Sequence, residues 1–478
     1  MIENLLKPDL CVIGGDPAGS SAALLAAALG ASVILVEPSR PAGLSPDEGR
    51  LARLALRAAA QAADLRRSSG PFGVAASRPR IDLARALSHV RAVVEASAAD
   101  RSPARLAALG VRVIEAEPFF VGPRLLRAGE AVIQARRYVV AAGSAPALPA
   151  IAGLEGTPLI NPDSVLDLDA APGRLIVLGG GTAALECAQA FRLLGADVTV
   201  AAPGPLLEGF DAELAAQLAT ALRRDGVDVR ASVLVSRVAP REGGVEVTLE
   251  GGETLSGARL MVAGARRASV DGLALEAAGV LTDASGVVVD ARMRTANRRI
   301  YAIGGCVGGP QGVSADRSPA HPGLQAAQAV QNALLWRNAK VDAALVPSVV
   351  ATAPELACVG LSESEARMRH KAIRVLRWPY SQNDRARAER LTTGEIKVIT
   401  TGSGVILGAA IIGAGAAEQI ATWTLAVKKG LNVAEFRDLA FPHPTYAEAS
   451  RQAALSFYTP LAAGRGLRRI LAFLRLFG

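Results

Sequence analysis

The sequence has few of the side chains that build metal centres and disulfide scaffolds. Its 478 residues include only 4 cysteines and 4 histidines. The cysteines lie far apart, without a CxxC pair or a Cys/His cluster, so the sequence predicts neither a zinc site nor a disulfide framework. We expect small, reduced core side chains at these positions and no bound metal. They are Cys11, Cys187, Cys306 and Cys358.

Long hydrophobic runs are also missing. The longest apolar stretch, residues 404–417, is rich in glycine and ends at Glu418. A membrane-spanning helix needs about 20 apolar residues, so this stretch is too short. The first ten residues show no charged-then-apolar secretory pattern. We therefore expect a cytoplasmic protein without a transmembrane helix.

Aromatic residues, at 4% of the chain, are too sparse and scattered to form a nucleic-acid surface. The tryptophans occur singly and give no platform on which bases could stack. The net charge of +8 permits anionic partners, but no recognition-helix motif accompanies the arginines of residues 367–390. We expect no nucleic-acid partner.

Glycine is abundant, with 48 residues or about a tenth of the chain, against a usual share of ~7%. Two glycine-containing segments, residues 9–38 and 174–203, share one pattern. Each has a short apolar strand, a glycine turn, an alanine-rich helix closed by a glycine, and a second β-branched strand. This is the beginning of a doubly wound nucleotide-binding unit. The sequence therefore predicts an α/β fold with two Rossmann-like domains.

The first glycine turn departs from the dinucleotide pattern at one position. Gly14 and Gly19 occupy the first and third small-residue positions, but the middle position is Asp16. A carboxylate there adds bulk and like-charge repulsion where a diphosphate would meet a helix N-terminus. Glu37 follows Gly14 by 23 residues, the spacing expected for an acid that binds a ribose hydroxyl.

The chain resembles the flavoprotein disulfide reductase family, which includes lipoamide dehydrogenase, glutathione reductase and mercuric reductase. The resemblance covers about residues 9–458 and is most specific in VPSVVATAPELACVGLSESEA, NDRARAER, GEIKVI and FPHPTYAE. It implies an FAD domain that is split by an inserted NAD(P) domain, followed by an α+β dimerisation domain. The implied FAD domain comprises residues 1–150 and 286–345, the NAD(P) domain 151–285, the dimerisation domain 346–458, and a basic tail 459–478. A homodimer follows from this resemblance.

The redox centre implied by the resemblance is absent. The family pattern has two cysteines and then a lysine, and AGLSPDEGRLARLAL aligns with it through its glycines. Ser45 and Arg50 then stand at the cysteine positions and Leu54 at the lysine. Because neither serine nor arginine can form a disulfide or a thiolate, disulfide reductase chemistry is excluded.

The second glycine turn is better preserved. Gly179, Gly181 and Ala184 satisfy GxGxxG/A, and the resemblance places Glu186 beside the flavin and nicotinamide. Ala202 stands where a ribose-binding acid is expected, and no arginine follows at once. The choice between NAD and NADP therefore stays open, and so does the loss of nicotinamide binding.

Two further glycines, Gly143 and Gly304, complete the predicted cofactor-binding residues. The resemblance implies an aspartate that bonds the flavin's ribityl chain at the position of Gly305. Glycine cannot make that bond, and losing a charge-assisted hydrogen bond weakens binding by ~1.5–3 kcal/mol.

His443 and Glu448 preserve the family's HPTxxE arrangement. A carboxylate beside an imidazole orients it as a general base, and the resemblance places this base at the partner subunit's flavin. The pair could equally be an inherited hydrogen bond that stabilises the interface.

Two hypotheses follow for the function. In the first, the protein is a cysteine-less FAD enzyme that passes electrons from NAD(P)H to a quinone, a metal ion or oxygen. His443, Glu448 and Glu186 are then its catalytic residues. In the second, it is a degenerate, inactive homologue that acts as a dimeric binding protein. Residues 461–478 contain no acid and place arginines beside an apolar helical face, which suggests an anionic membrane surface or a packing role.

Overall fold

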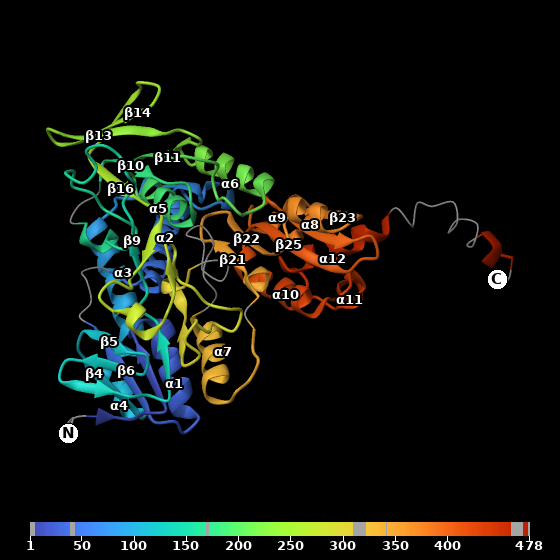
Figure 1. The fold of residues 1–478 in the computed structure, drawn as a ribbon. Helices are drawn as coiled ribbons and strands as arrows, with labels where there is room; N and C mark the ends of the chain where they lie inside the picture. The colour runs from blue at the N-terminus through green and yellow to red at the C-terminus, as the bar shows by residue number, and fades with distance from the viewer. Residues whose placement is uncertain are drawn as a thin grey trace. The chain divides into compact units, whose positions relative to one another are not determined.

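The computed structural model describes residues 5–38, 44–168, 172–308, 322–340, 342–459 and 472–476. The chain forms two compact units (Figure 1). The first unit comprises Met1–Glu208 and Leu222–Ala343, and the second comprises Gly209–Ala221 and Ala344–Gly478.

A five-stranded parallel sheet organises the first unit. Its strand order is β20-β8-β2-β3-β4, so a late strand returns to pair with early ones. This topology confirms the predicted doubly wound α/β class. The strands are β2 (Leu10–Ile13), β3 (Val33–Glu37), β4 (Val111–Glu115), β8 (Arg137–Val140) and β20 (Ile300–Ala302).

Both faces of this sheet are buried, which explains its continuous apolar strands. Successive side chains point to opposite faces. Leu10 and Val12 pack with helices α1 (Pro17–Ala28) and α7 (Pro322–Leu334). Cys11 and Ile13 pack on the other face against a second sheet of order β1-β7-β6-β5. The strands of that sheet are β1 (Leu5–Leu6), β5 (Pro118–Gly122), β6 (Leu125–Ala128) and β7 (Ala131–Ile133).

The second glycine-containing segment builds another parallel sheet, of order β12-β11-β10-β16. A three-stranded antiparallel meander, β13-β14-β15, shares its hydrophobic core. The elements are β10 (Arg174–Leu178), α5 (Thr182–Leu193), β11 (Asp197–Ala201), β12 (Asp228–Arg230), β13 (Val235–Arg241), β14 (Gly244–Leu249), β15 (Thr254–Gly257) and β16 (Arg259–Val262).

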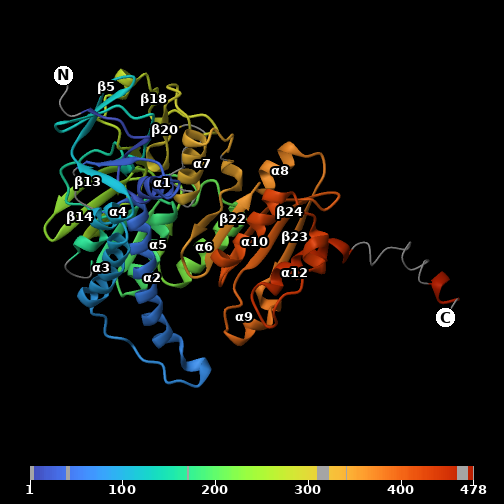
Figure 2. The ribbon, with the colours of Figure 1, turned by 90° about the horizontal axis from the view of Figure 1, so that it is seen from below.

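Two connections lead from these sheets to the site. Helix α2 (Pro46–Ser68) packs against α5 and runs beside α3 (Leu83–Ala99), as Figure 2 shows. A short antiparallel ribbon joins β9 (Ser144–Pro146) to β17 (Arg266–Ala268). The smaller elements of the unit are α4 (Pro103–Ala108), β18 (Thr282–Asp283) and β19 (Gly286–Val287).

The second unit is an antiparallel sheet of order β21-β22-β25-β24-β23 that shares a core with helices. Trp423 and Phe436 stack in this core with ring centroids 4.0 Å apart. The elements are β21 (Ser348–Val350), β22 (Glu355–Gly360), α8 (Glu363–Arg369), β23 (Ile373–Pro379), α9 (Asp384–Ala388), β24 (Glu395–Thr401), β25 (Ile406–Gly413), α10 (Ala416–Lys429), α11 (Val433–Asp438) and α12 (Glu448–Leu455). Helix α6 (Ala212–Arg224) begins in this unit.

The predicted basic helix of residues 461–478 lies outside the described residues, except for residues 472–476. It therefore stays a prediction, as does its membrane surface. Within the described ranges, none of the helices has the length and hydrophobicity needed to cross a bilayer.

Candidate functional site

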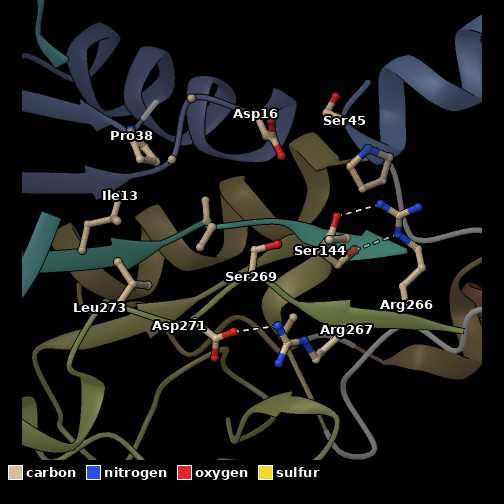
Figure 3. A pocket seen from close by; sticks show the side chains of 18 of the residues that line it. Ile13, Asp16, Pro38, Ser45, Ser144, Arg266, Arg267, Ser269, Asp271 and Leu273 are labelled. Atoms are coloured by element: carbon tan, nitrogen blue, oxygen red, sulfur yellow. Dashed lines mark hydrogen bonds and ion pairs between the residues drawn. The ribbon is translucent and has the colours of Figure 1, made fainter. Parts of the chain in front are cut away.

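A cavity of about 620 Å³ lies in the first unit, at the carboxyl ends of β2, β3 and β8 (Figure 3). Doubly wound sheets bind ligands at this edge, and the volume lies within the ~300–1,000 Å³ usual for small-molecule sites. The polar and charged side chains of the lining are Asp16, Glu37, Ser45, Glu117, Ser144, Asn161, Asp163, Ser164, Arg266, Arg267, Ser269 and Asp271.

The first glycine turn forms one wall of the cavity. Two of its positions have no room for a side chain. Gly14 has φ +105°, and a Cβ there would lie 2.2 Å from the Ala141 carbonyl oxygen. A Cβ on Gly19 would lie 1.9 Å from the Gly14 carbonyl oxygen. Both positions therefore require glycine, as the dinucleotide pattern predicts.

Glu37 lies beside this turn at the end of β3. Its carboxylate reaches within 2.6–2.7 Å of the point that a Cβ on Gly15 would occupy. Glu37 also lines the cavity. In doubly wound folds that bind dinucleotides, an acid near the end of this strand contacts the ribose.

Asp16 lines the cavity from the position immediately before α1. It is the N-cap residue, but its side chain makes no capping hydrogen bond. Its Oδ2 atom lies 2.6 Å from the point that a Cβ on Gly143 would occupy, and Gly143 has φ +72°. Figure 3 shows Asp16 directed toward the segment that carries Ser144. The carboxylate therefore occupies the space in front of the helix N-terminus, where the macrodipole favours an anion.

These features allow the predicted FAD to be tested against the cavity. The obligatory glycines, the acid at the end of β3 and the cavity volume fit a dinucleotide. Asp16 is the exception, because its carboxylate stands beside the expected diphosphate. The lining thus fits FAD in shape, with one opposing charge.

The position that corresponds to the first family cysteine has a structural role in this chain. Ser45 caps α2, and its Oγ accepts a hydrogen bond from the Glu48 amide at 3.3 Å. The Ser45 amide donates to Glu48 Oε2 at 3.0 Å, which completes a capping box. Arg50 lies 3.8 Å from Asp47, and Leu54 is exposed. This end of the cavity therefore carries a helix cap instead of a dithiol.

Sequence reasoning missed an ion pair one turn further along α2. The Arg53 Nε donates to Glu186 Oε2 at 2.8 Å, and both side chains are buried. Burial is the largest single influence and would lower the pKa of Arg53, but Glu186 together with Cys187 and Asp163 leaves the pKa raised. Arg53 and Glu186 are 133 residues apart, and no local sequence pattern joins them.

A second missed pair closes the same end of the cavity. Arg266 Nη1 lies 2.5 Å from Asp163 Oδ2, and its Nη2 donates to the Ser144 carbonyl at 2.7 Å. Asp163 is only 5% exposed, and a Cβ on Gly49 would lie 2.5 Å from its Oδ1. The pair comes from segments about a hundred residues apart, which no local pattern reveals.

Gly304 and Gly305 follow β20 close to this end of the cavity. Gly304 has φ +74°, and its amide donates to the Gln325 side chain at 2.7 Å. A Cβ on Gly305 would lie 2.7 Å from the Ser144 hydroxyl. Ser144 therefore occupies the space into which an aspartate side chain at position 305 would extend.

The second glycine turn forms a separate structure in the other parallel sheet. A Cβ on Gly179 would lie 2.2 Å from the Ala263 carbonyl oxygen, Gly181 is the N-cap of α5, and Ala184 is fully buried. A Cβ on Gly180 would lie 2.8 Å from the Ala202 methyl group. Apolar packing thus replaces the ribose-binding acid at this turn.

His443 and Glu448 lie together in the second unit. His443 Nδ1 is 3.0 Å from both carboxylate oxygens of Glu448, and the Thr445 amide donates to Glu448 Oε2 at 3.2 Å. The His443 side chain is 64% exposed. The structure therefore brings this pair together as predicted, in a unit separate from the cavity.

Comparison with known proteins agrees with this architecture. Residues 8–332 match the model of the pyridine nucleotide-disulphide oxidoreductase family, and residues 346–454 match its dimerisation domain. A mercuric reductase of Streptomyces lividans is 31% identical, covering 95% of this chain and 97% of its own length. A dihydrolipoyl dehydrogenase of Thermus scotoductus is 33% identical, with 93% and 96% covered.

A solved structure is similar over the same extent. The HOCl-induced flavoprotein disulfide reductase RclA from Escherichia coli superposes with a TM-score of 0.81 at 26% identity, covering 94% of this chain and 99% of its own. The match of both domain models, together with relatives above 30% identity over almost full length, decides the family. The chain belongs to the pyridine nucleotide-disulphide oxidoreductase family.

Proposed function

We propose that this protein is a flavin-dependent NAD(P)H oxidoreductase that passes electrons to an acceptor other than a disulfide. The observation that carries the proposal is the cavity of about 620 Å³, whose glycine turn and Glu37 suit a dinucleotide while its far end holds Ser45. Bound FAD would accept a hydride from NAD(P)H and deliver electrons onward.

The absence of a dithiol separates this proposal from the relatives' named reactions. None of the described residues that line the cavity is a cysteine. Three of the four thiols are buried elsewhere in strands or helices, and Cys358 is partly buried in β22 of the second unit. An acceptor that reacts directly, such as a quinone, a metal ion or dioxygen, fits this chemistry better than a disulfide.

Residues of the first unit would hold the cofactor and fix its surroundings. Gly14 makes the tight turn, Gly19 allows α1 to pack closely on the sheet, and Glu37 can accept hydrogen bonds from ribose hydroxyls. Arg53 holds Glu186 through a buried ion pair, so the orientation of this carboxylate is fixed before any ligand binds. The second glycine turn would bind the nicotinamide nucleotide, and with Ala202 at the ribose position it does not select NAD or NADP by charge.

The His443–Glu448 pair is suited to proton transfer. Because Glu448 accepts from Nδ1–H, the neutral imidazole exposes Nε2 as a base. We propose that the protein is a homodimer through residues 346–454 and that His443 serves the partner subunit's cavity. The protonated form would then supply a proton to the reduced acceptor.

The alternative is a binding protein without redox activity. The observation that favours it is the capping box at Ser45, which stabilises α2 where the relatives' pattern has a cysteine. Apolar packing of Ala202 on Gly180 points the same way.

Anaerobic spectroscopy distinguishes the two. Purified protein is mixed with FAD and then with NADH or NADPH, and the visible flavin absorption is followed against a protein-free control. Protein-dependent bleaching supports the oxidoreductase. If the protein never affects the flavin spectrum, the oxidoreductase proposal fails and the binding protein without redox activity is favoured.

A further inference from the structure

The loop that carries His443 is held by a chain of hydrogen bonds that starts outside the loop. His443 Nδ1 lies 3.0 Å from both carboxylate oxygens of Glu448, and Glu448 Oε2 also accepts from the Thr445 amide at 3.2 Å. The carbonyl oxygen of Thr445 accepts in turn from the Asn383 side-chain amide at 2.9 Å. Asn383 is therefore connected to the imidazole through two intervening residues.

Asn383 is buried, with 4% of its surface exposed, and both polar atoms of its side chain have partners. Its Oδ1 accepts from the Ala386 amide at 2.9 Å, which caps α9, while its Nδ2 donates to Thr445. Because Oδ1 faces an N–H group and Nδ2 faces a carbonyl, the orientation of the amide is fixed by its partners. A serine at this position could still cap the helix, but its side chain is too short to reach Thr445.

The same segment holds the loop at a second point. The Tyr446 hydroxyl donates to Glu389 Oε2 at 2.5 Å. The Tyr446 ring stacks on the ring of the buried Tyr380, with the centroids 5.7 Å apart. Residues 445–446 are thus bound to residues 380–389 through both main-chain and side-chain contacts.

His443 needs such support because its ring is exposed. With 64% of the side chain exposed, water competes for both ring nitrogens, and a neutral imidazole in water exchanges its proton between them. A carboxylate fixed at Nδ1 keeps the proton on that atom and leaves Nε2 as the base. The Thr445 amide fixes the Glu448 carboxylate, so a displacement of Thr445 would release it.

We propose that Asn383 is a positioning residue for His443, which acts through Thr445 and Glu448 to keep the imidazole proton on Nδ1 and to leave Nε2 available for proton transfer. The use of that base rests on the proposed function, whereas the tautomer is a property of the protein without flavin or acceptor. The two proposals can therefore fail separately.

Nitrogen NMR of the histidine rings tests the positioning role. The chain has 4 histidines, so full-length protein with isotope-labelled histidine gives few ring signals, and His443→Gln assigns those of His443. In alkaline solution the nitrogen shifts report the ratio of the Nδ1–H to the Nε2–H tautomer. We expect the Nδ1–H form to dominate in the wild type. Asn383→Ser should lower the ratio about fivefold, which corresponds to ~1 kcal/mol, the usual contribution of one hydrogen bond.

Asn432→Ser is the matched control. Asn432 caps α11 through Oδ1 and donates through Nδ2 to the Ser403 carbonyl at 2.9 Å, so the same substitution removes the same kind of bond from a different loop of this unit. It should leave the His443 ratio unchanged. An equal fall in Asn432→Ser, or an unchanged ratio in Asn383→Ser, would overturn the inference.

Asn383→Asp keeps the test available if the serine variant does not fold. Aspartate caps helices as well as asparagine does, but it has no N–H group to donate to Thr445. It should lower the tautomer ratio as the serine variant does, and an unchanged ratio would count against the inference in the same way.

Flavin reduction is measured separately on the same proteins. If NADH or NADPH bleaches bound flavin while the ratio is equal in the wild type and Asn383→Ser, the proposed function stands and the positioning role fails. If the ratio falls as expected but flavin is never reduced, the positioning role stands and the proposed function fails.

Discussion

Arg53 and Glu186 form a buried ion pair with a 2.8 Å contact, although 133 positions separate them in the chain. The pair joins α2, which begins at Ser45, to α5, which begins at the second glycine turn. It therefore connects the helix that follows the first glycine-containing segment to the helix of the second. Both side chains are buried, so water cannot take the place of either one if it is removed.

Removal of one partner should destabilise the protein strongly. Arg53→Met removes the cation that is hydrogen-bonded to the buried Glu186 carboxylate, and breaking such a buried pair lowers the free energy of unfolding by ~3–5 kcal/mol. Urea unfolding measures the change. Arg50→Met on the same helix is the control, since the Arg50 side chain is 34% exposed and 3.8 Å from Asp47, and should cost less than ~1 kcal/mol. Equal losses of unfolding free energy for the two variants would show that the buried ion pair stabilises the fold no more than the Arg50–Asp47 contact does.

Ser45 should behave as a helix cap. Ser45→Ala removes the acceptor for the Glu48 amide, and such losses cost ~1 kcal/mol of unfolding free energy. Ser45→Thr keeps a hydroxyl acceptor and should retain most of the stability. If alanine and threonine proved indistinguishable in thermal unfolding, the capping interpretation would be wrong.

The buried thiols should not react in the native protein. Burial raises the pKa of Cys187 to about 12 and that of Cys306 to about 11. At pH 8 both are protonated, and the thiolate is the nucleophile. A disulfide reagent at this pH should therefore label at most Cys358 before unfolding and all four thiols afterwards. Rapid native labelling of Cys187 or Cys306 would contradict this.

The same shifts predict a loss of stability in alkaline solution. Because the folded thiols hold their protons more tightly than unfolded ones, their contribution is complete below the unfolded pKa of ~8.5. It is lost as the pH rises from there toward about 11 for Cys306 and about 12 for Cys187. Replacement of both by alanine should flatten this part of the pH–stability curve.

In the second unit, Tyr446 should stabilise the protein in a pH-dependent way. Its hydroxyl donates to Glu389 Oε2 at 2.5 Å and is the main cause of the lowered pKa of that carboxyl group. A lowered pKa stabilises the fold above the unfolded value of ~4.3 and is lost as the pH falls through the folded one. Tyr446→Phe should thus be destabilising at pH 7 and nearly neutral at pH 3. A constant difference across this range would rule out the carboxylate as the cause.

The sequence predicted the parallel sheets and glycine turns because their signals are local. Continuous apolar strands, the glycine turn at Gly14 and the acid Glu37 all lie within one 30-residue segment. The His443–Glu448 pair was equally readable, since five residues separate its members.

The ion pairs Arg53–Glu186 and Asp163–Arg266 were not predictable in this way. Each depends on which segments the fold brings together, and a single arginine on an amphipathic helix carries no signal of its partner. The sequence predicted that Asp16 opposes a diphosphate, and the structure adds that its carboxylate is directed into the cavity and makes no capping hydrogen bond.

Anaerobic titration of FAD-saturated protein with NADH or NADPH tests the central claim most directly, namely that this chain moves electrons through flavin without a dithiol. The account predicts bleaching of the visible flavin absorption that depends on the protein. Flavin that stays oxidised with both NADH and NADPH would contradict it.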